Sequence, residues 1–187
     1  MRCEMRRRGI VFLGAIVSIG LLNSVALAAH HERFKENCSG AFVTAQFSFD
    51  GSGNAGQYTA SCRTSMGRAL KTGVSQSATN VTGICTAPDG TAGTQYNLLE
   101  RFDSVTFEKD GSQLFSFSNS GTECYSNTTN VFSKTESWTI NGGTGKFKNA
   151  TGNGTESING ITIDKPASPG FGTFGAEQTN SIGTISW

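Results

Sequence analysis

The chain has 187 residues, a formal net charge of +1 and 16% charged residues, below the roughly 25% of ordinary soluble domains. It is too short for a large multi-domain enzyme and too weakly charged for a nucleic-acid-binding protein. Its content of apolar and aromatic residues excludes an intrinsically disordered chain.

The N-terminal segment has the composition of a secretory signal peptide. Four Arg and one Glu precede an apolar run at residues 9–22, and Ala26-Leu27-Ala28 supplies the small residues of a cleavage site. We predict cleavage after Ala28, with Ala29 as the alternative, so that residues 1–28 are the signal peptide and residues 29–187 form one domain. The run is shorter than the roughly 20 apolar residues of a spanning helix, which disfavours the other interpretation, an uncleaved anchor.

Removal of this segment changes the charge of the chain. Four Arg and one Glu leave with it, so the mature chain has 11 basic and 13 acidic residues, a net charge of about −2. The positive charge therefore belongs to the export signal, and no basic excess remains to attract nucleic acid or anionic lipid. We predict a periplasmic or extracellular protein with no nucleic-acid partner.

The two histidines of the chain, His30 and His31, both lie at the predicted mature N-terminus. A free amine with His at the third position can bind Cu²⁺ or Ni²⁺, and after cleavage at Ala29 the amine and His30 could chelate copper. A frayed, solvated terminus is the favoured alternative, so we predict neither a metal site nor a cofactor. Their position also makes a Ser-His-Asp or Cys-His site inside the domain hard to build.

The mature chain keeps an even number of cysteines: Cys38, Cys62, Cys85 and Cys124. No C-x-x-C pair occurs, which argues against a zinc site or a thioredoxin-type motif. We predict two disulfides, as is usual in an exported chain. Three connectivities remain open, and free buried thiols are the alternative.

Short stretches with period-two alternation cover most of the domain. In residues 41–50 the apolar positions Ala41, Val43, Ala45, Phe47 and Phe49 alternate with polar residues, which predicts a strand with that face buried. The clearest hairpin is Thr106–Ser118, which turns at Asp110-Gly111. Further strands are expected around Thr79–Ala87, Val131–Ile140, Gly154–Ile163 and Gly183–Trp187.

Turn signals separate these stretches, and helical signals are scarce. Turns are expected at the Asp-Gly and Asn-Gly pairs that begin at residues 50, 89, 141, 153 and 159, and a loop at Asp164–Gly170. The best helix candidates, Ser65–Ser75 and Gln95–Phe102, are short. This pattern predicts an all-β sandwich or barrel.

One predicted strand carries charged residues among large apolar ones. Strict alternation along Val131–Ile140 places Phe132, Lys134, Glu136 and Trp138 on one face. Such a face could line a ligand-binding cavity, where Glu136 would act as an acid or base beside Lys134. The alternative is a bulge, or a pair at the rim, that leaves both charges in solvent.

The segment from Ile140 to Gly154 reads INGGTGKFKNATGNG. Its glycines predict a sharp bend between two strands, and its spacing does not fit a phosphate-binding loop. The string G-G-T-G-x-F-x-x-A-x-G resembles the stretch shared by allene oxide cyclases and dirigent proteins. The matching residues are Gly142, Gly143, Thr144, Gly145, Phe147, Ala150 and Gly152, and the ending Gly183–Trp187 is similar to that family's last strand.

This resemblance implies an eight-stranded antiparallel barrel with a central cavity, frequent homo-oligomers and the binding of small apolar molecules. In the family the motif shapes a hairpin and does no chemistry. Two functions follow as expectations. The first is an exported barrel that binds a small apolar ligand or has a structural role, and the alternative is a cyclase or isomerase that acts by shaping its substrate.

A third class, a small outer-membrane barrel, fits the sequence less well. The last strand has Thr179, Ser181 and Gly183 at alternate positions, where a lipid-facing band should be apolar. We therefore expect no stable insertion into a membrane.

Overall fold

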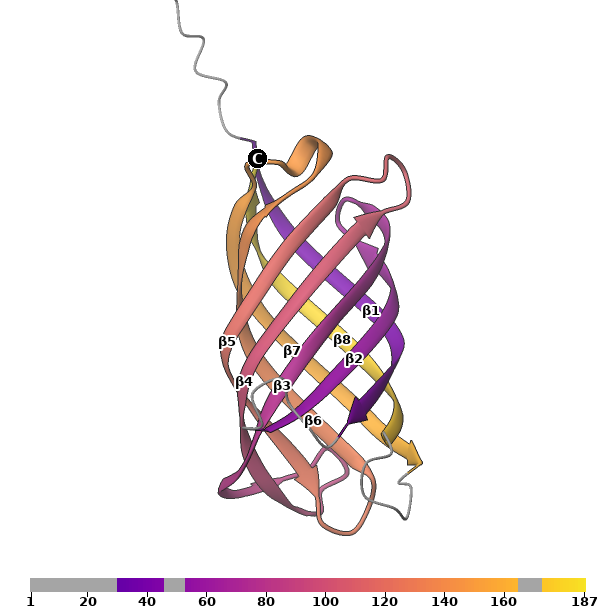
Figure 1. Cartoon of the computed structure of the whole chain (residues 1–187), viewed down its shortest axis with the longest axis vertical. Helices are drawn as coiled ribbons and strands as arrows, with labels where there is room; N and C mark the ends of the chain where they lie inside the picture. The colour runs from indigo at the N-terminus through magenta and orange to yellow at the C-terminus, as the bar shows by residue number, and fades with distance from the viewer. Residues whose placement is uncertain (1–29, 46–52, 165–172) are drawn as a thin grey trace, which may run out of the picture.

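The computed structural model describes residues 30–45, 53–164 and 173–187, which form a closed all-β barrel of eight antiparallel strands (Figure 1). The barrel predicted from the resemblance is thus confirmed as a fold. The signal peptide predicted at residues 1–28, the expected turn at Asp50-Gly51 and most of the expected loop Asp164–Gly170 lie outside the described residues. The strands are β1 (His31–Ala45), β2 (Gly53–Thr64), β3 (Gly67–Thr86), β4 (Ala92–Phe107), β5 (Gln113–Ser126), β6 (Val131–Gly143), β7 (Thr151–Asp164) and β8 (Thr173–Ser186).

Each strand pairs with its sequence neighbours, and β1 closes the barrel by pairing with β8. One end of the barrel carries both described chain termini, the short connections β2–β3, β4–β5 and β6–β7, and a single 3₁₀ turn, η1 (Gly145–Phe147). We call it the η1 end. The opposite end, where β1–β2, β3–β4, β5–β6 and β7–β8 connect, is called the distal end. No helix of the described chain is both long and apolar enough to cross a bilayer.

The hydrophobic core fills the η1 end of the barrel. Phe147 from η1 is fully buried and packs against Phe107 and Trp187, with ring centroids 5.1 and 5.3 Å apart. Hydrogen bonds between His30 and Trp187 hold the two chain ends together beside this cluster. The remaining core residues come from β1 to β6, β8 and the β6–β7 connection: Phe34, Cys38, Ala60, Cys62, Ala69, Val105, Leu114, Trp138, Ile140, Ala150 and Ile185.

The glycine motif builds the connection that closes this end. Gly142 and Gly145 have φ of +101° and +58°, a left-handed conformation that favours glycine. The backbone N–H of Thr144 donates to the carbonyl oxygen of Gln113, and its hydroxyl accepts from the Gln113 N–H. The motif therefore ties the β6–β7 connection to β5 and inserts Phe147 into the core.

Two Asn-Gly pairs expected to form turns lie inside β7 instead. A Cβ atom added at Gly154 would overlap the ring of Trp138, and one added at Gly160 would overlap the ring of Phe132. The prediction of turns at these pairs was wrong, because the missing side chains make room for aromatic rings on β6. Asp89-Gly90 and Asp110-Gly111 do form turns between strands, as predicted.

Three other local predictions were also wrong. On β1 the buried face carries Phe34, Glu36 and Cys38, and Val43 is 37% exposed, so the face expected to be buried points outward. The stretches expected to be helical, Ser65–Ser75 and Gln95–Phe102, lie mainly in β3 and β4. Pairing with neighbouring strands overrides their weak local preference.

The four cysteines form two disulfides, Cys38–Cys62 and Cys85–Cys124, so the predicted number is confirmed and the pairing is resolved. Cys38 and Cys62 face each other across β1 and β2, inside the core. The second bond joins β3 to β5 across the intervening strand β4. A Cβ added at Gly93 of β4 would lie 2.9 Å from the sulfur of Cys124, so glycine there leaves space for the bridge.

Replacement of Gly143 by alanine should destabilise the fold, since its added Cβ would overlap the carbonyl oxygen of Gln113. The expected loss is about 1–3 kcal/mol of unfolding free energy, the usual cost of overpacking, measured by urea denaturation. Gly83→Ala is the matched control, because a Cβ there meets no atom within 4 Å. Equal stability of the two variants would contradict this account of the motif.

Candidate functional site

The face of β6 identified from the sequence points into the barrel. Phe132, Glu136 and Trp138 are buried, and the side chain of Lys134 is 13% exposed. The four residues lie at successive levels, from Phe132 near the distal end to Trp138 in the core at the η1 end. They therefore belong to three different environments and do not form one site: Phe132 and Lys134 lie toward the distal end, Glu136 in the middle of the lumen and Trp138 in the core.

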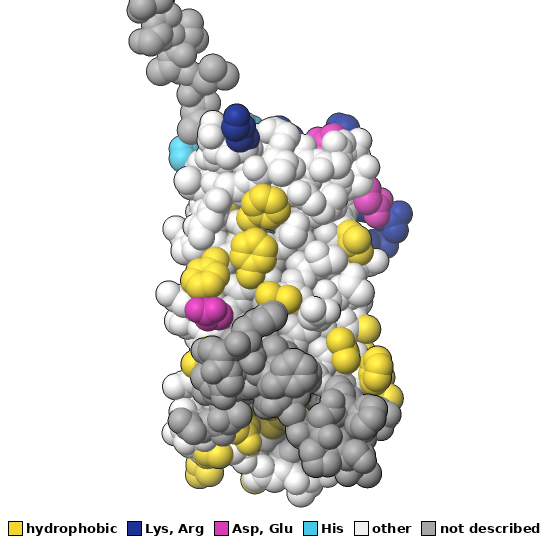
Figure 2. All heavy atoms as spheres, in the orientation of Figure 1, with side chains coloured by type: hydrophobic (Ala, Val, Ile, Leu, Met, Phe, Trp, Pro, Cys, Tyr) yellow, Lys and Arg dark blue, Asp and Glu magenta, His cyan; other side chains and the backbone are white. Residues whose placement is uncertain are grey.

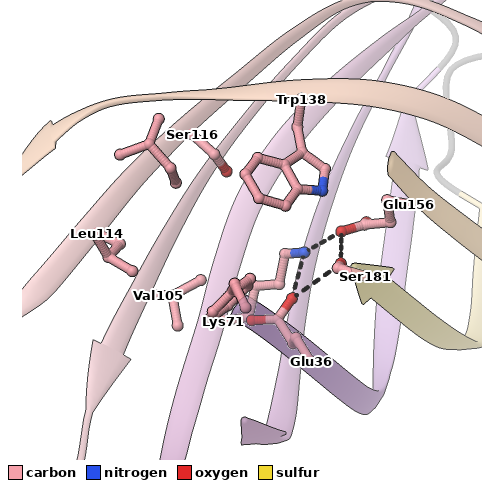
Figure 3. A pocket seen from close by; sticks show the side chains of 10 residues that line it. Glu36, Lys71, Val105, Leu114, Ser116, Trp138, Glu156 and Ser181 are labelled. Carbon is pink, nitrogen blue, oxygen red and sulfur yellow. Dashed lines mark hydrogen bonds and ion pairs between the residues drawn. The ribbon is translucent and has the colours of Figure 1, made fainter. Parts of the chain in front are cut away.

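The middle of the barrel holds Lys71 of β3 within a group of carboxylates (Figure 3). Its Nζ lies 2.9 Å from Oε1 of Glu36, 3.2 Å from Oδ2 of Asp103 and 2.5 Å from Oε2 of Glu156. The Ser181 hydroxyl lies 2.5 Å from the same Glu156 oxygen and 3.4 Å from Glu36 Oε1. This ammonium therefore joins strands β1, β3, β4 and β7 through the lumen.

Arg101 of β4 is the second cation of this network. Its Nε donates to Asp103 Oδ1 at 3.1 Å and to the Tyr58 hydroxyl at 3.2 Å, and lies 3.4 Å from Glu136 Oε1. Its Nη2 lies 3.1 Å from Glu156 Oε1, without the direction of a hydrogen bond. The guanidinium also stacks on the Tyr58 ring, 4.2 Å from the centroid.

Acidic groups outnumber basic groups in the described interior. Six buried carboxylates face three bases: Glu36, Asp103, Glu123, Glu136, Glu156 and Glu177 against Lys71, Arg101 and Lys134. One oxygen each of Glu36 and Glu136 has no hydrogen-bond partner among the described residues. Burying unbalanced charge is costly, so this network favours the retention of protons on some carboxyl groups.

The pKa shifts differ among these carboxyl groups. Burial, reinforced by the neighbouring Glu156 and Glu136 carboxylates, raises the pKa of Asp103 well above its ordinary value. Burial also raises the pKa of Glu136, although Arg101 opposes the shift. Burial acts on the pKa of Glu156 in the same direction, but the positive charges of Lys71 and Arg101 outweigh burial and hold this pKa at about 2.

Lys71 remains charged despite its burial. Burial disfavours its ammonium form, but the Glu156 and Glu36 carboxylates outweigh that effect and raise the pKa of Lys71. The network thus combines the cations Lys71 and Arg101, an ionised Glu156, and two carboxyl groups with raised pKa values, Asp103 and Glu136. Carboxylic acids beside an arginine can donate protons and stabilise negative charge on a bound molecule.

A separate ion pair lies toward the distal end. Lys134 Nζ is 3.1 Å from Glu123 Oε1 and 5.3 Å from the centroid of the Phe132 ring. Phe132 itself packs edge-on against Phe42 and stacks on Tyr125, with centroids 5.4 and 5.0 Å apart. We call Phe42, Tyr125 and Phe132 the distal aromatic group.

A small cavity separates the network from the core. It holds about 10 Å³ between Glu36, Lys71, Glu156 and Trp138, with Val105 and Leu114 on its apolar side (Figure 3). This volume is close to the minimum for one water molecule and far below that of a ligand pocket. Trp138 presents its unpartnered Nε1 beside it and packs edge-on against Phe34.

Some of the described residues could hold a cation. Asp103, Glu136 and Glu156 each present a carboxylate oxygen, and the three oxygens lie within 4.8 Å of one another. Lys71 and Arg101 already supply positive charge to the same oxygens. Glu36, Cys38 and Cys62 also lie close together, but both sulfurs are consumed in the disulfide.

His31 begins β1, and His30 immediately precedes it. The backbone N–H of His30 donates to the Trp187 carbonyl oxygen, and His31 pairs with Ser186, whose hydroxyl lies 2.6 Å from its Nδ1. The His30 N–H, one of the nitrogens that the copper site considered above would use, is therefore engaged in a hydrogen bond.

The sequence interpretation underestimated the buried acids. Asp103, Glu123 and Glu156 were not among the candidate residues, and each is at most 4% exposed. A signal for them exists: Arg101 and Asp103 continue the alternation of the buried Val105 and Phe107. Lys71 follows Ala69 in the same manner on β3. Charged residues at the same alternate positions as buried apolar residues of a strand therefore indicate the buried network.

Comparison with known proteins gives no relative for this chain: no family model, curated protein or solved structure matches it.

The raised pKa values of Asp103 and Glu136 predict how stability depends on pH. A carboxyl group whose pKa is raised in the folded state stabilises the fold below its unfolded pKa, and this contribution is lost as the pH rises through the folded pKa. We therefore expect the unfolding free energy to be larger at pH 5 than at pH 8, by up to about 1.4 kcal/mol per pH unit for each proton released.

Asp103→Asn should weaken the dependence of the unfolding free energy on pH, because asparagine resembles the protonated acid. Urea unfolding at several pH values measures this slope. Glu100→Gln, on the outer face of the same strand, is the control and should leave the slope unchanged. A wild-type protein that becomes steadily more stable from pH 5 to pH 8 would contradict the assignment.

Proposed function

We propose that this protein is an exported barrel of the allene oxide cyclase and dirigent type that binds a small, mainly apolar molecule at its distal end. The observation that carries the proposal is that the two halves of the barrel interior are filled differently. The η1 half is closed by a packed core. The distal half combines aromatic rings with a lysine, an acid and a phenol.

The η1 half offers no entry to a ligand. Phe147 is fully buried, Ile185 and Phe107 are at most 1% exposed, and the chain ends are hydrogen-bonded across them. The central network below the core leaves a cavity the size of one water molecule. A ligand would therefore have to enter from the distal end and rest against the network.

The distal end offers suitable groups for such a ligand. Phe42 and Tyr125 are half-buried, so their rings present apolar surface beside the buried Phe132. Lys134 and the Tyr125 hydroxyl supply polar atoms next to that surface, and the hydroxyl lies 3.5 Å from Thr162 Oγ1. A few polar groups among aromatic walls are typical of sites that orient small molecules.

Export to the periplasm or the extracellular space is part of the proposal. Two disulfides are compatible with an oxidising, exported environment. The predicted signal peptide supports the same compartment. The outer faces of β6 and β7 carry uncharged polar side chains where a lipid-facing band would be apolar, which supports a barrel without stable membrane insertion: Thr135, Ser137, Thr139, Asn153, Thr155 and Ser157.

The proposal also includes a homo-oligomer, since one outer face is apolar. Figure 2 shows hydrophobic side chains gathered on the face that β3, β4 and β5 present in Figure 1. Leu70 and Phe102 are 47% and 46% exposed there, and Phe102 stacks with Phe115 at 6.2 Å. Exposed apolar patches of this kind commonly mark contacts between subunits.

Native mass spectrometry of the protein purified from its exporting host should detect a bound small molecule. Phe132→Leu, which alters the distal aromatic group, should lose it because one ring of the wall is removed. Phe102→Leu, a matched change on the outer face, should retain it. Absence of any adduct on the wild-type protein, or equal retention by both variants, would overturn the binding proposal.

A second candidate, a cyclase or isomerase, is favoured by the raised pKa of Glu136 beside Arg101. Glu136 would give a proton to the bound molecule and take one back, so that its composition stays unchanged. Lys134, on the same face of β6, would help to orient the molecule while the barrel holds it in a reactive shape.

Glu136→Gln distinguishes binding from turnover. If the barrel converts its ligand, the wild-type protein should release the product and the variant should release the isomeric substrate. The two have the same mass and differ in chromatographic retention. The same molecule released from both proteins would exclude Glu136 as a catalytic acid, with unfolding measured to confirm that the variant is folded.

A further inference from the structure

The charges of the mature chain are unequally divided between the lumen and the surface. Of the charged side chains that the structure describes, six acids and three bases lie in the lumen. Among the described surface residues, seven bases accompany five acids. The overall charge therefore hides a basic exterior.

These surface bases lie at one end of the barrel. All seven belong to strand ends or connections at the η1 end: Arg33, Lys35, Arg63, Arg68, Lys109, Lys146 and Lys148. Three acids accompany them, Glu32, Glu108 and Asp110. Figure 2 shows the same distribution, since the Lys and Arg side chains visible on that face all lie toward the end that carries the C-terminus. The η1 end thus has a positive potential that the rest of the described surface lacks.

Four of these bases form a continuous patch across three strands, which we call the basic patch: Arg33 and Lys35 on β1, Arg63 on β2 and Arg68 on β3. Arg63 and Arg68 are direct cross-strand partners in the β2–β3 ladder. None of the four forms an ion pair with an acid in the part of the chain that the structure describes, whereas Lys146 pairs with Asp110 at 3.0 Å. Like charges placed directly opposite each other destabilise a sheet, so this arrangement carries a cost that a bound anion would relieve.

The basic patch borders a shallow hollow. The hollow has a volume of about 420 Å³, and Lys35 and Arg63 line it together with five neutral polar residues, Ile182 and the buried Glu36. Asn37 donates to Asn180 across its floor at 2.6 Å, and Thr64 and Ser65 lie at its edge. A cation pair beside amides and hydroxyls matches a ligand that combines negative charge with hydroxyl groups.

We propose that the basic patch and its hollow bind an anionic polysaccharide on the outside of the barrel. This site is distinct from the proposed ligand site in the lumen and does not depend on it. Its position on the outer face of β8, β1 and β2 leaves room for a long polymer, which the lumen does not.

Two other polyanions fit the surface less well. Binding to an anionic membrane gains strength from apolar side chains that insert into the interface. Among the described residues, two exposed large apolar side chains lie close to the patch, Leu70 and Ile182, and two are few for such insertion. Single-stranded nucleic acid needs exposed aromatic rings for stacking, and Trp187 at this end is partly covered by His30, with ring centroids 4.6 Å apart. The hollow's amides and hydroxyls favour sugar.

Immobilised heparin and isothermal titration with heparin oligosaccharides test the proposal. Wild-type protein should bind heparin, elute at moderate salt and gain thermal stability when heparin is present. The triple variant Lys35→Gln, Arg63→Gln, Arg68→Gln should bind about tenfold more weakly, since each exposed charge contact contributes modestly. Because it removes a like-charged pair, its melting temperature without heparin should not fall.

The matched control changes the net charge equally but away from the patch. Gln57→Glu, Thr135→Glu and Gln178→Glu together lower the charge by three on exposed positions of β2, β6 and β8. This control should keep most of the heparin affinity. Equal weakening of both triple variants, or no binding by the wild-type protein at physiological salt, would overturn the site.

Two further titrations compare heparin with other negatively charged ligands. Vesicles containing phosphatidylglycerol and a single-stranded DNA oligonucleotide are titrated under the same conditions. Weaker binding to both than to heparin supports the polysaccharide. Tighter binding to either, with the same loss in the triple glutamine variant, would overturn the assignment to a polysaccharide.

Discussion

The ion network at the middle of the lumen is the constraint on which the rest of the structure depends. Lys71 and Arg101 each contact carboxylates from several strands, so these two cations tie opposite walls of the barrel together. Removing either one would leave buried acids without a counterion, which is far more costly than losing an exposed pair. The raised pKa of Asp103 is a consequence of its burial and of the same crowding of acids.

Because the network occupies the centre, it divides the interior into two halves. Toward the η1 end the lumen is sealed by a hydrophobic core, and the glycines of the β6–β7 connection allow Phe147 to reach it. Toward the distal end lie the distal aromatic group and the Lys134–Glu123 pair. A ligand of the kind proposed would therefore enter from the distal end and rest against the charged network.

The burial of acidic side chains in the lumen also affects the charge of the outer surface. The described residues include more acids than bases, yet the η1 end is basic, because six carboxylates lie in the lumen while the described surface lysines and arginines lie near that end. Elsewhere the surface carries uncharged hydroxyl and amide side chains on β6 and β7 and an apolar face on β3 to β5. The three parts of the surface therefore differ in chemistry.

The sequence by itself determined the strand-rich fold class, the four paired cysteines, the β4–β5 hairpin and the inward face of β6, since each depends on local alternation, turn residues or composition. The eight-stranded closure was expected from the resemblance around Phe147. Only the tertiary structure decided which cysteines pair, that Gly154 and Gly160 accommodate rings instead of forming turns, and that Lys71, Arg101 and Glu156 meet. The physical reason is that these contacts join strands far apart in sequence. The alternation of one strand shows which way a side chain points but not which side chains it will meet across the lumen.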